Sequence, residues 1–174
     1  MPRCKICKDK FEPKYFLQKV CLDPTCILSW KDKVKEKEWK AEKKAIKESL
    51  KTNADHVREL QVIFNKFIRL RDKGLNCISC NKSAKKENAG HYKSAGGHPE
   101  HRFNEKNVHL QCEYCNTFLH GNLIEYRKGL IKKIGLEEVE LLENHIIPMK
   151  YSIPELKNMK EHYKEKIKNY ESNR

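Results

Sequence analysis

The chain has 174 residues, of which 38% are hydrophobic and 35% are charged. This composition leaves too little apolar material for one large core, so it favours small units that are stabilised by metal and joined by solvated helices. Lys and Arg outnumber Asp and Glu by 37 to 24, giving a charge of +13. This charge favours a polyanionic partner such as nucleic acid over the alternative that the surplus lysine only aids solubility. No apolar run approaches the roughly 18 residues that would indicate a membrane span.

The cysteines carry the clearest pattern. All 8 fall in four close pairs, at positions 4/7, 21/26, 77/80 and 112/115. Disulfides are the alternative, but the first residues, Met-Pro-Arg-Cys-Lys, contain no apolar stretch typical of a signal peptide. We therefore expect a reducing cytosol, in which free thiols bind metal. Four thiolates usually hold one structural zinc, so we expect two zinc ions, one bound by Cys4, Cys7, Cys21 and Cys26 and the other by Cys77, Cys80, Cys112 and Cys115.

Residues 1–28 are expected to form the N-terminal zinc unit, with a few aromatic residues as its core. Asp23 and Pro24 favour the turn that brings Cys21 and Cys26 together. The function of this unit stays open at this point. It can contact DNA, contact a partner, or only cap the helix that follows.

Residues 29–73 are predicted to be a helical arm. The first part lacks proline and glycine and is rich in Lys, Glu and Ala, which indicates a solvated helix anchored on the zinc unit by Trp30 and Trp39. From a candidate N-cap at Thr52, apolar residues recur every three or four positions. We expect a helix at 53–73 that packs on the core or on a second subunit.

Residues 74–135 are predicted to form the central unit. Two short strands are expected, around 89–92 and 107–111, joined by an irregular loop over 93–106 that is rich in Gly, His and Pro. After the last cysteine pair we expect a helix from about 116 to 135. Two further helical segments, 136–145 and 153–171, are interpreted as packing or dimerisation elements in a C-terminal region over 136–174. The expected fold is α+β and mostly helical.

Strand, loop, strand, zinc knuckle and helix follow one another in the order of a ββα-metal nuclease. Phosphodiester cleavage needs an activated water and a cation on the scissile phosphate. His91 can take the water proton because the pKa of an imidazole lies near neutrality. Asn116 and His120 are four residues apart, so on a helix they would face the same way and could hold one divalent ion. Asn107 is expected to hydrogen-bond across the loop and fix the shape that aims His91.

Residues 77–127 contain the pattern Cys-x2-Cys … Ala-Gly-His-Tyr … Arg-Phe-Asn-x3-Val-His-x-Gln-Cys-x2-Cys-Asn … Gly-Asn-x2-Glu-Tyr-Arg. With this pattern the chain resembles the HNH superfamily and, more narrowly, the NinG/Rap recombination proteins of lambda-like phages. The N-terminal cysteine unit and the lysine-rich helix also match that family's layout, and the architecture is similar to phage recombination endonuclease VII. The resemblance implies a phage-encoded endonuclease in the host cytoplasm, selective for branched DNA such as Holliday junctions and D-loops. It also implies Mg²⁺ or Mn²⁺ as the catalytic metal.

The same resemblance implies roles for single residues. His91 would be the general base, and Asn107 would be the structural asparagine. Asn116 would be the metal-ligating asparagine, and His120 would be the extra histidine that some of these enzymes have one turn later. Many HNH enzymes have a metal-binding Asp just before the base, where this chain has Gly90. The metal would then depend on Asn116 and His120 and on a loop histidine, His98 or His101, and such neutral ligands tolerate Mn, Ni or Zn as well as Mg.

The remaining polar residues have simpler interpretations. His109 is expected to point inward beside the zinc as a packing residue, and His56, His145 and His162 belong to no recognisable cluster. Glu125 and Tyr126 can reach DNA in this interpretation, and Arg127 is the favoured phosphate contact. The full set of expected nucleic-acid contacts is Lys93, Arg102, Arg127 and Lys128.

Three functions are compatible with these features. Symmetric cutting of a junction needs two sites, so the nuclease is expected to be a homodimer that uses its apolar helix faces for pairing. A non-catalytic zinc protein that binds DNA or RNA would need only the knuckles and the charge. An HNH nuclease of another specificity, such as a nicking or packaging enzyme, is the third. His91 together with Asn116 favours a nuclease, because a protein that only binds needs neither.

Overall fold

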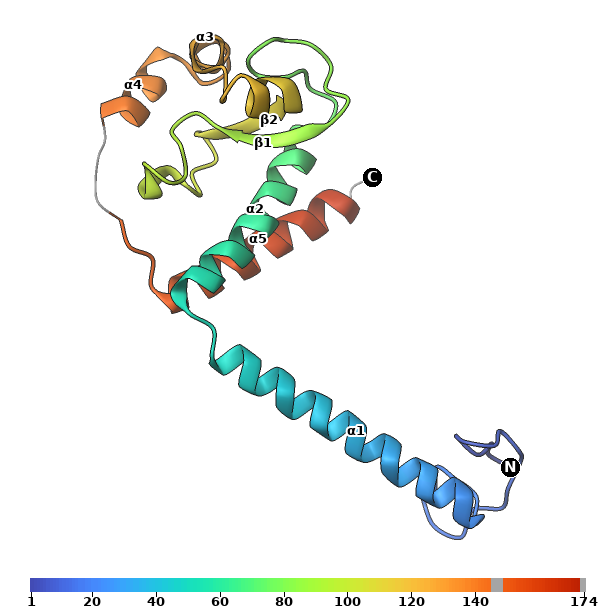
Figure 1. Cartoon of the computed structure of the whole chain (residues 1–174). Helices are drawn as coiled ribbons and strands as arrows, with labels where there is room; N and C mark the ends of the chain where they lie inside the picture. The colour runs from blue at the N-terminus through green and yellow to red at the C-terminus, as the bar shows by residue number, and fades with distance from the viewer. Residues whose placement is uncertain (145–148, 173–174) are drawn as a thin grey trace. The chain divides into compact units, whose positions relative to one another are not determined.

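The computed structural model describes residues 1–144 and 149–172, and the chain divides into two compact units, Met1–Lys51 and Thr52–Arg174. As predicted, the structure is α+β and mostly helical, with a single two-stranded sheet among the described residues (Figure 1). The segments predicted at 1–28 and in the first part of the arm form the first unit. In the described parts of the chain, no helix has the length and apolarity needed to cross a membrane.

The first unit consists of a cysteine-rich loop region followed by α1 (Pro24–Ser49). We expected a turn at residues 23–24 and a helix from residue 29, and this boundary was wrong. The Asp23 carboxylate accepts hydrogen bonds from the backbone N–H groups of Thr25 (2.8 Å) and Cys26 (3.2 Å), so Asp23 is an N-cap. Proline is favoured in the first helical turn because it has no N–H to leave unsatisfied. The last cysteine of this unit therefore lies inside α1.

One of the two predicted tryptophan anchors is present in the first unit. Trp30 packs against a small core formed by Cys4, Val20 and Cys26. The prediction for Trp39 was wrong, because its side chain is 54% exposed. All residues over 31–50 are exposed, as expected for a solvated charged helix.

The second unit begins with α2 (Asn53–Arg71), which starts at a capping box between Thr52 and Asp55. Its apolar face packs against α5 (Ile153–Ser172), and the two helices lie side by side in Figure 1. Four residues of α2 and three of α5 are buried in the shared core: Leu60, Phe64, Phe67 and Ile68, and Leu156, Tyr163 and Ile167. The amphipathic faces predicted in both segments therefore cover each other within one chain.

Strands β1 (Glu87–His91) and β2 (Val108–Cys112) form an antiparallel ladder, with His91 opposite Val108. Both strands occur where they were predicted, with ends that differ by one or two residues. The loop between them contains a short 3-10 turn (Pro99–His101). α2 packs against both strands, so the sheet and the helix pair share one core.

The helix predicted from residue 116 to 135 is interrupted. Its first part is a short π-helical turn, η2 (Tyr114–Phe118), and the regular helix α3 begins at Leu123 and ends at Ile134. Between them the backbone is left-handed at His120 (φ 47°) and Asn122 (φ 44°), which breaks the helical path.

α4 (Leu136–Asn144) follows after Gly135 and packs on α3. Tyr126 and Leu130 of α3 contribute buried side chains to this smaller core, as do Val139 and Leu142 of α4. The segment predicted at 136–145 is thus helical as far as residue 144. His145 lies outside the described residues.

Candidate functional site

The first cysteine group has the geometry of a zinc site. The four sulfur atoms lie within 4.8 Å of one another, and those of Cys7 and Cys21 are 3.9 Å apart. A tetrahedron with zinc–sulfur bonds of about 2.3 Å requires sulfur atoms roughly 3.8 Å apart. Burial opposes ionisation of the Cys4 thiol, but backbone N–H groups of Cys21, Ile6 and Cys7 point at its sulfur and hold its pKa down at about 6. The spacing of the four sulfur atoms therefore makes this loop region suited to a thiolate-bound ion.

The second cysteine group meets the same criterion. Its four sulfur atoms also lie within 4.8 Å of one another, and those of Cys80 and Cys112 are 3.8 Å apart. The Cys77–Cys80 turn and the end of β2 supply three ligands, and Cys115 in η2 supplies the fourth. Burial opposes ionisation of Cys77, yet backbone N–H groups around its sulfur lower its pKa. All 8 cysteines are free, so the two predicted groups could each hold one structural zinc.

His91 ends β1, and its ring is held from one side. Its Nε2 lies 3.0 Å from the carbonyl oxygen of Arg102. A carbonyl only accepts hydrogen bonds, so Nε2 carries the ring proton and Nδ1 keeps its lone pair. Burial, aided by the charge of Arg102, lowers the pKa of His91 below its usual 6.5 and outweighs this hydrogen bond. The imidazole is therefore neutral near pH 7 and has the protonation state that a general base needs.

Position 90 explains why no acid precedes this histidine. A Cβ atom on Gly90 would lie 2.2 Å from Oε1 of Gln111 and 2.9 Å from its Cβ. Gln111 is fully buried and is fixed by hydrogen bonds from its Nε2 to Ser79 (2.7 Å) and to the carbonyl of Gly121 (2.6 Å). The space that an aspartate would need is therefore filled from β2. A glycine inside a predicted strand is a sequence signal for such a close approach.

Asn107 bridges the loop between the strands, as predicted from its position. Its side-chain oxygen accepts from the backbone N–H of Lys93 at 2.7 Å. Its side-chain nitrogen donates to the carbonyls of Lys93 (2.9 Å) and His101 (3.0 Å). These bonds tie the start and an inner turn of the loop to one fully buried side chain at the other end of the loop. The carbonyl that holds His91 belongs to the residue after His101, so Asn107 also fixes the orientation of the imidazole.

The expected geometry of Asn116 and His120 was wrong. We expected them on one helix face, but Asn116 lies in η2 and His120 lies in the left-handed stretch after it. Asn116 is half-buried and His120 is exposed, and neither side chain makes a hydrogen bond within the described part of the chain. The Asn116 amide and the His120 imidazole are therefore not engaged with another side chain or the backbone in this part of the structure. The predicted metal-binding roles of Asn116 and His120 stay predictions.

The loop histidines surround an acid that the sequence analysis did not single out. The Glu100 carboxylate lies 3.1 Å from Nδ1 of His98 and 4.0 Å from Nε2 of His101. His98 is partly exposed, whereas His101 is buried. Among the described residues, the groups of three or more side chains close enough to share a metal are the two cysteine groups. A role of His98 or His101 as a metal ligand stays a prediction.

Two of the expected DNA contacts have other partners. Tyr126 is fully buried and cannot reach DNA, because its hydroxyl donates to the carbonyl of Gly90 (2.8 Å) inside the core. Arg127 forms a two-pronged ion pair with Glu143 of α4, with N–O distances of 2.8 and 2.9 Å. Glu143 also accepts from Tyr92, and these two contacts lower the pKa of Glu143 to about 2. Arg127 thus fastens α3 to α4.

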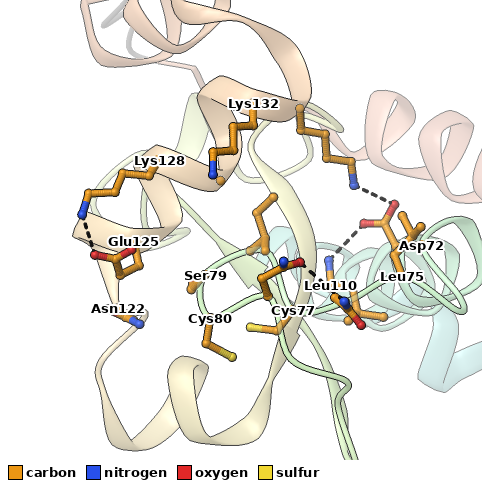
Figure 2. Close-up of a pocket in the computed structure, with 15 residues that line it drawn as sticks. Asp72, Leu75, Cys77, Ser79, Cys80, Leu110, Asn122, Glu125, Lys128 and Lys132 are labelled. Atoms are coloured by element: carbon orange, nitrogen blue, oxygen red, sulfur yellow. Dashed lines mark hydrogen bonds and ion pairs between the residues drawn. The ribbon is translucent and has the colours of Figure 1, made fainter.

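The other expected contacts remain at least partly accessible. Arg102 is half-buried and donates to the carbonyl of Ala95 at 2.7 Å. Lys128 is exposed and pairs with Glu125 at 2.7 Å, as Figure 2 shows. Lys93 is half-buried, with its Nζ 5.7 Å from the centre of the Tyr92 ring. Nucleic-acid binding by these three residues stays a prediction.

A buried acid network that the sequence analysis missed joins α2, β2 and α3. Asp72 accepts from Arg71 (2.8 Å), from the backbone N–H of Leu110 (3.0 Å) and from Lys133 (3.1 Å). Burial opposes its ionisation, but hydrogen bonds from His109 and Arg71 hold the pKa of Asp72 well below its usual range. His109 is buried as predicted. Because an unpaired buried charge is costly, this network has a structural role.

A cavity of about 620 Å³ lies between the second cysteine group and α3 (Figure 2). Its walls include the Cys77–Cys80 turn, Asp72 and the lysines of α3, with Lys132 and Lys128 labelled in the figure. None of the four predicted catalytic residues lines this cavity. Its position next to the cysteine group assigns it to the scaffold around that group and not to the predicted catalytic residues.

Comparisons with known proteins agree with the resemblance to the NinG proteins. The family model described as Bacteriophage Lambda NinG protein matches residues 1–173. A protein of Escherichia phage lambda named Protein ninG is 36% identical over 193 residues, which cover 99% of this chain and 94% of that protein. Proteins of the same name from Escherichia phage 933W and Salmonella phage P22 are each 34% identical, and the alignments cover 99% of this chain and 94% and 95% of those proteins. No solved structure matches the chain.

Proposed function

Because the chain belongs to the NinG family of phage proteins, we propose that it is a structure-selective endonuclease that hydrolyses phosphodiester bonds in branched recombination intermediates. Its substrates would be Holliday junctions and D-loops, in the cytoplasm of the infected host. A homodimer would supply the two sites that a symmetric cut requires. The formal charge of +13 supports a polyanionic substrate.

The observation that carries the proposal is the state of His91. Its Nε2 is bound to the Arg102 carbonyl at 3.0 Å, and its Nδ1 keeps a lone pair on a neutral ring. A base that removes a proton from water needs this protonation state and a fixed orientation. A histidine that served only in packing would not need a ring held neutral and in one orientation at the end of a strand. Asn107 supports the role, because its bonds hold the loop that orients the ring.

A divalent metal would supply positive charge to the scissile phosphate in this reaction. Asn116 and His120 would hold it, since both have side-chain donors without partners within the described residues. An amide oxygen and an imidazole nitrogen are ligands that Mg²⁺ accepts poorly as a pair and Mn²⁺ accepts better. We therefore expect activity with Mn²⁺ to exceed activity with Mg²⁺.

Cleavage of a synthetic four-way junction beside a linear duplex of the same sequence tests the proposal. The wild-type chain should cut the junction in Mn²⁺ and leave the duplex largely intact. His91→Ala should lower the rate about 10²–10⁴-fold, which is the usual effect of losing a general base. His162→Ala is the matched control, because His162 is an exposed histidine of α5 away from the loop that holds His91. Equal cutting by His91→Ala and wild type would refute the proposal.

A second candidate is a zinc protein that binds DNA or RNA without cutting it. Two observations favour it: Gly90 leaves no room for an acid before His91, and the metal donors do not share a helix face. The same assay separates the two functions. Tight junction binding by a wild-type chain that does not cut in any of Mg²⁺, Mn²⁺, Ni²⁺ or Zn²⁺ would establish the binding protein.

A further inference from the structure

The first unit displays an apolar loop that neither its core nor its cysteine group uses. Tyr15, Phe16 and Leu17 are consecutive, and they are 63%, 91% and 74% exposed. The core of this unit is formed instead by Cys4, Val20 and Cys26 with their neighbours. Three adjacent large apolar side chains in water are unfavourable for an isolated protein, so they indicate a surface that something covers.

The loop is braced from inside. Gln18 is buried, its side-chain oxygen accepts from the backbone N–H of Lys14 (2.7 Å), and its side-chain nitrogen donates to the carbonyl of Val20 (2.7 Å). Leu17 has a φ of 63°, in the left-handed region that a leucine rarely adopts. Such strain persists only where the surrounding structure imposes it, and it is frequent at binding sites. The three side chains are therefore held outward.

The charges around the loop select the kind of ligand. A hollow beside Tyr15 and Phe16 is lined by Arg3, Lys5 and Lys19, and every charged residue that lines it is a cation. None of these three cations has an acidic partner in the described part of the chain. Arg3 donates to the carbonyl of Lys8 (3.2 Å) and Lys19 lies over the Trp30 ring (5.7 Å), and neither contact neutralises the charge. Apolar side chains next to cations without acidic partners match a ligand that offers flat apolar faces beside phosphates. DNA with unstacked bases is such a ligand.

The distribution of charge in the chain favours DNA over an apolar protein surface. Residues 1–51 contain 15 Lys and Arg against 8 Asp and Glu, so they carry +7 of the total charge of +13 in less than a third of the length. The first unit is therefore the more densely cationic of the two. Attraction to phosphate would bring this loop to the nucleic acid before any apolar contact forms.

We propose that the loop Tyr15–Leu17 is a wedge that inserts against unstacked bases at the branch point of DNA, while Arg3, Lys5 and Lys19 bind the flanking phosphates. Phe and Leu side chains are the kind that proteins insert between base steps. Unstacking is less costly where the duplex is already interrupted, so the wedge would favour branched over linear DNA. The inference rests on DNA being the ligand of the proposed function, but it does not depend on cleavage.

The test measures binding of the full-length chain without added Mg²⁺ or Mn²⁺. The probes are a four-way junction with 2-aminopurine at the branch point and a linear duplex with 2-aminopurine at its centre. Wild type should raise the emission of the junction probe as the base unstacks. Phe16→Ser should abolish this rise and weaken junction binding about tenfold, which corresponds to the loss of one stacking contact. Its affinity for the linear duplex should change less than twofold.

Two further variants make the result specific. Phe16→Trp keeps a large flat side chain and should retain junction affinity. Val62→Ser removes another exposed apolar side chain, 70% exposed, from α2 and should have no effect. Zinc content identical to wild type shows that Phe16→Ser leaves the unit folded. If zinc is lost, a Tyr15→Ser variant, which removes the neighbouring exposed ring, is used and should show the same selective loss for the junction.

Several outcomes would overturn the wedge. The first is that Phe16→Ser gives the same emission rise and the same junction affinity as wild type. The second is that Phe16→Ser loses affinity equally for the junction and the duplex. A change of subunit number in Phe16→Ser by light scattering would assign the loop to a second copy of the chain. Binding of wild type but not Phe16→Ser to anionic phospholipid vesicles would assign it to a membrane surface. Absence of cleavage alone would refute the proposed nuclease and leave this inference intact.

Discussion

At the residue scale, Gly90 and Gln111 determine what the sheet can present next to His91. The two residues lie on neighbouring strands, and the Gln111 side chain occupies the space beside the Gly90 Cα. Its Oε1 is buried without a hydrogen-bond partner in the described structure, while its Nε2 has two acceptors. Gln111 is therefore held tightly on one side and cannot easily move away from Gly90. Any side chain at position 90 must displace it.

Gly90→Ala should destabilise the second unit by about 1–3 kcal/mol, which is the usual effect of overpacking a core. The matched control is Gly96→Ala, because a Cβ on Gly96 meets no atom within 4 Å. That substitution should be neutral or stabilise the protein by up to about 1 kcal/mol through the unfolded state. Urea unfolding of both variants measures the difference. Equal stability of Gly90→Ala and wild type would show that Gln111 moves freely and that position 90 is not closed to an acid.

The pKa of His91 predicts how the proposed cleavage depends on pH. Burial lowers this pKa below 6.5, so the neutral, proton-accepting ring persists to a lower pH than in a free histidine. As the pH falls through the lowered pKa, the ring gains a proton and the rate should drop in proportion to the neutral fraction. A pH–rate profile for junction cleavage should therefore have its acidic midpoint below 6.5.

Two comparisons make the pH profile diagnostic. His162→Ala should keep the profile of the wild-type chain, because His162 is exposed on α5, whereas His91 lies in β1. His91→Ala should have a lower rate and lose the acidic midpoint altogether. A wild-type midpoint well above 6.5 would mean that a group other than His91, or a His91 with an acidic partner, governs the rate.

At the element scale, the sequence predicted those elements whose pattern is local. The apolar periodicity of α2 and α5 identified both helices, and each buries the face that was expected. The helix after Cys115 was not predictable in the same way. Its residues have no proline, and the break lies at the left-handed conformations of His120 and Asn122, with Gly121 between them as a breaker residue in the sequence. Asn116 and His120 are four residues apart in the sequence, but because of this break they do not share a helix face.

The same contrast applies to the candidate site. The cysteine groups and the loop-bridging Asn107 were predictable, because spacing and residue type determine them. The roles of the acids Asp72 and Glu143 were not predictable. Asp72 accepts from Leu110, which is 38 residues away along the chain, and Glu143 pairs with Arg127, which is 16 residues away. Long-range pairing of charges leaves no pattern in a single sequence.

The two cysteine groups lie in different compact units, which predicts independent responses to mutation. Cys26→Ser should lower the zinc content from two to about one per chain and unfold the loop region before α1. The second unit should keep its hydrogen-exchange protection, because its core is formed by α2, α5 and the sheet. Cys77→Ser should instead remove the other zinc and destabilise the sheet. Loss of both ions in Cys26→Ser would contradict the division into two units.

At the scale of the whole molecule, positive charge is spread over both units. Residues 1–51 carry +7 and residues 52–174 carry +6, from 15 against 8 and from 22 against 16 ionised basic and acidic side chains. A zinc ion held by four thiolates adds a net charge of about −2 to each unit, and both remain positive. Neither unit alone accounts for the positive electrostatic field of the molecule. Both are therefore available to contact phosphates.

DNA binding should consequently be steeply dependent on salt. Each phosphate contact releases a condensed counterion, so the logarithm of the binding constant falls against the logarithm of salt concentration with a slope of about −0.9 per contact. If six or more cations are engaged, affinity should drop by about three orders of magnitude or more between 50 and 200 mM salt. Fluorescence anisotropy with a labelled junction over this range measures the slope, and a flat response would exclude an electrostatic interface.

A pair of matched double variants locates the contacts. Lys5→Gln with Lys19→Gln removes two of the charges that line the hollow beside the Tyr15–Leu17 loop, and Lys157→Gln with Lys168→Gln removes two exposed charges from α5. Total charge changes equally in both proteins, so a general effect of the protein's field would alter both slopes alike. Direct phosphate contact at the loop should reduce the slope by about 1.8 in the first variant and leave it nearly unchanged in the second. Equal slopes in the two variants would mean that the first unit contributes only its long-range field, and that the phosphates are bound elsewhere on the chain.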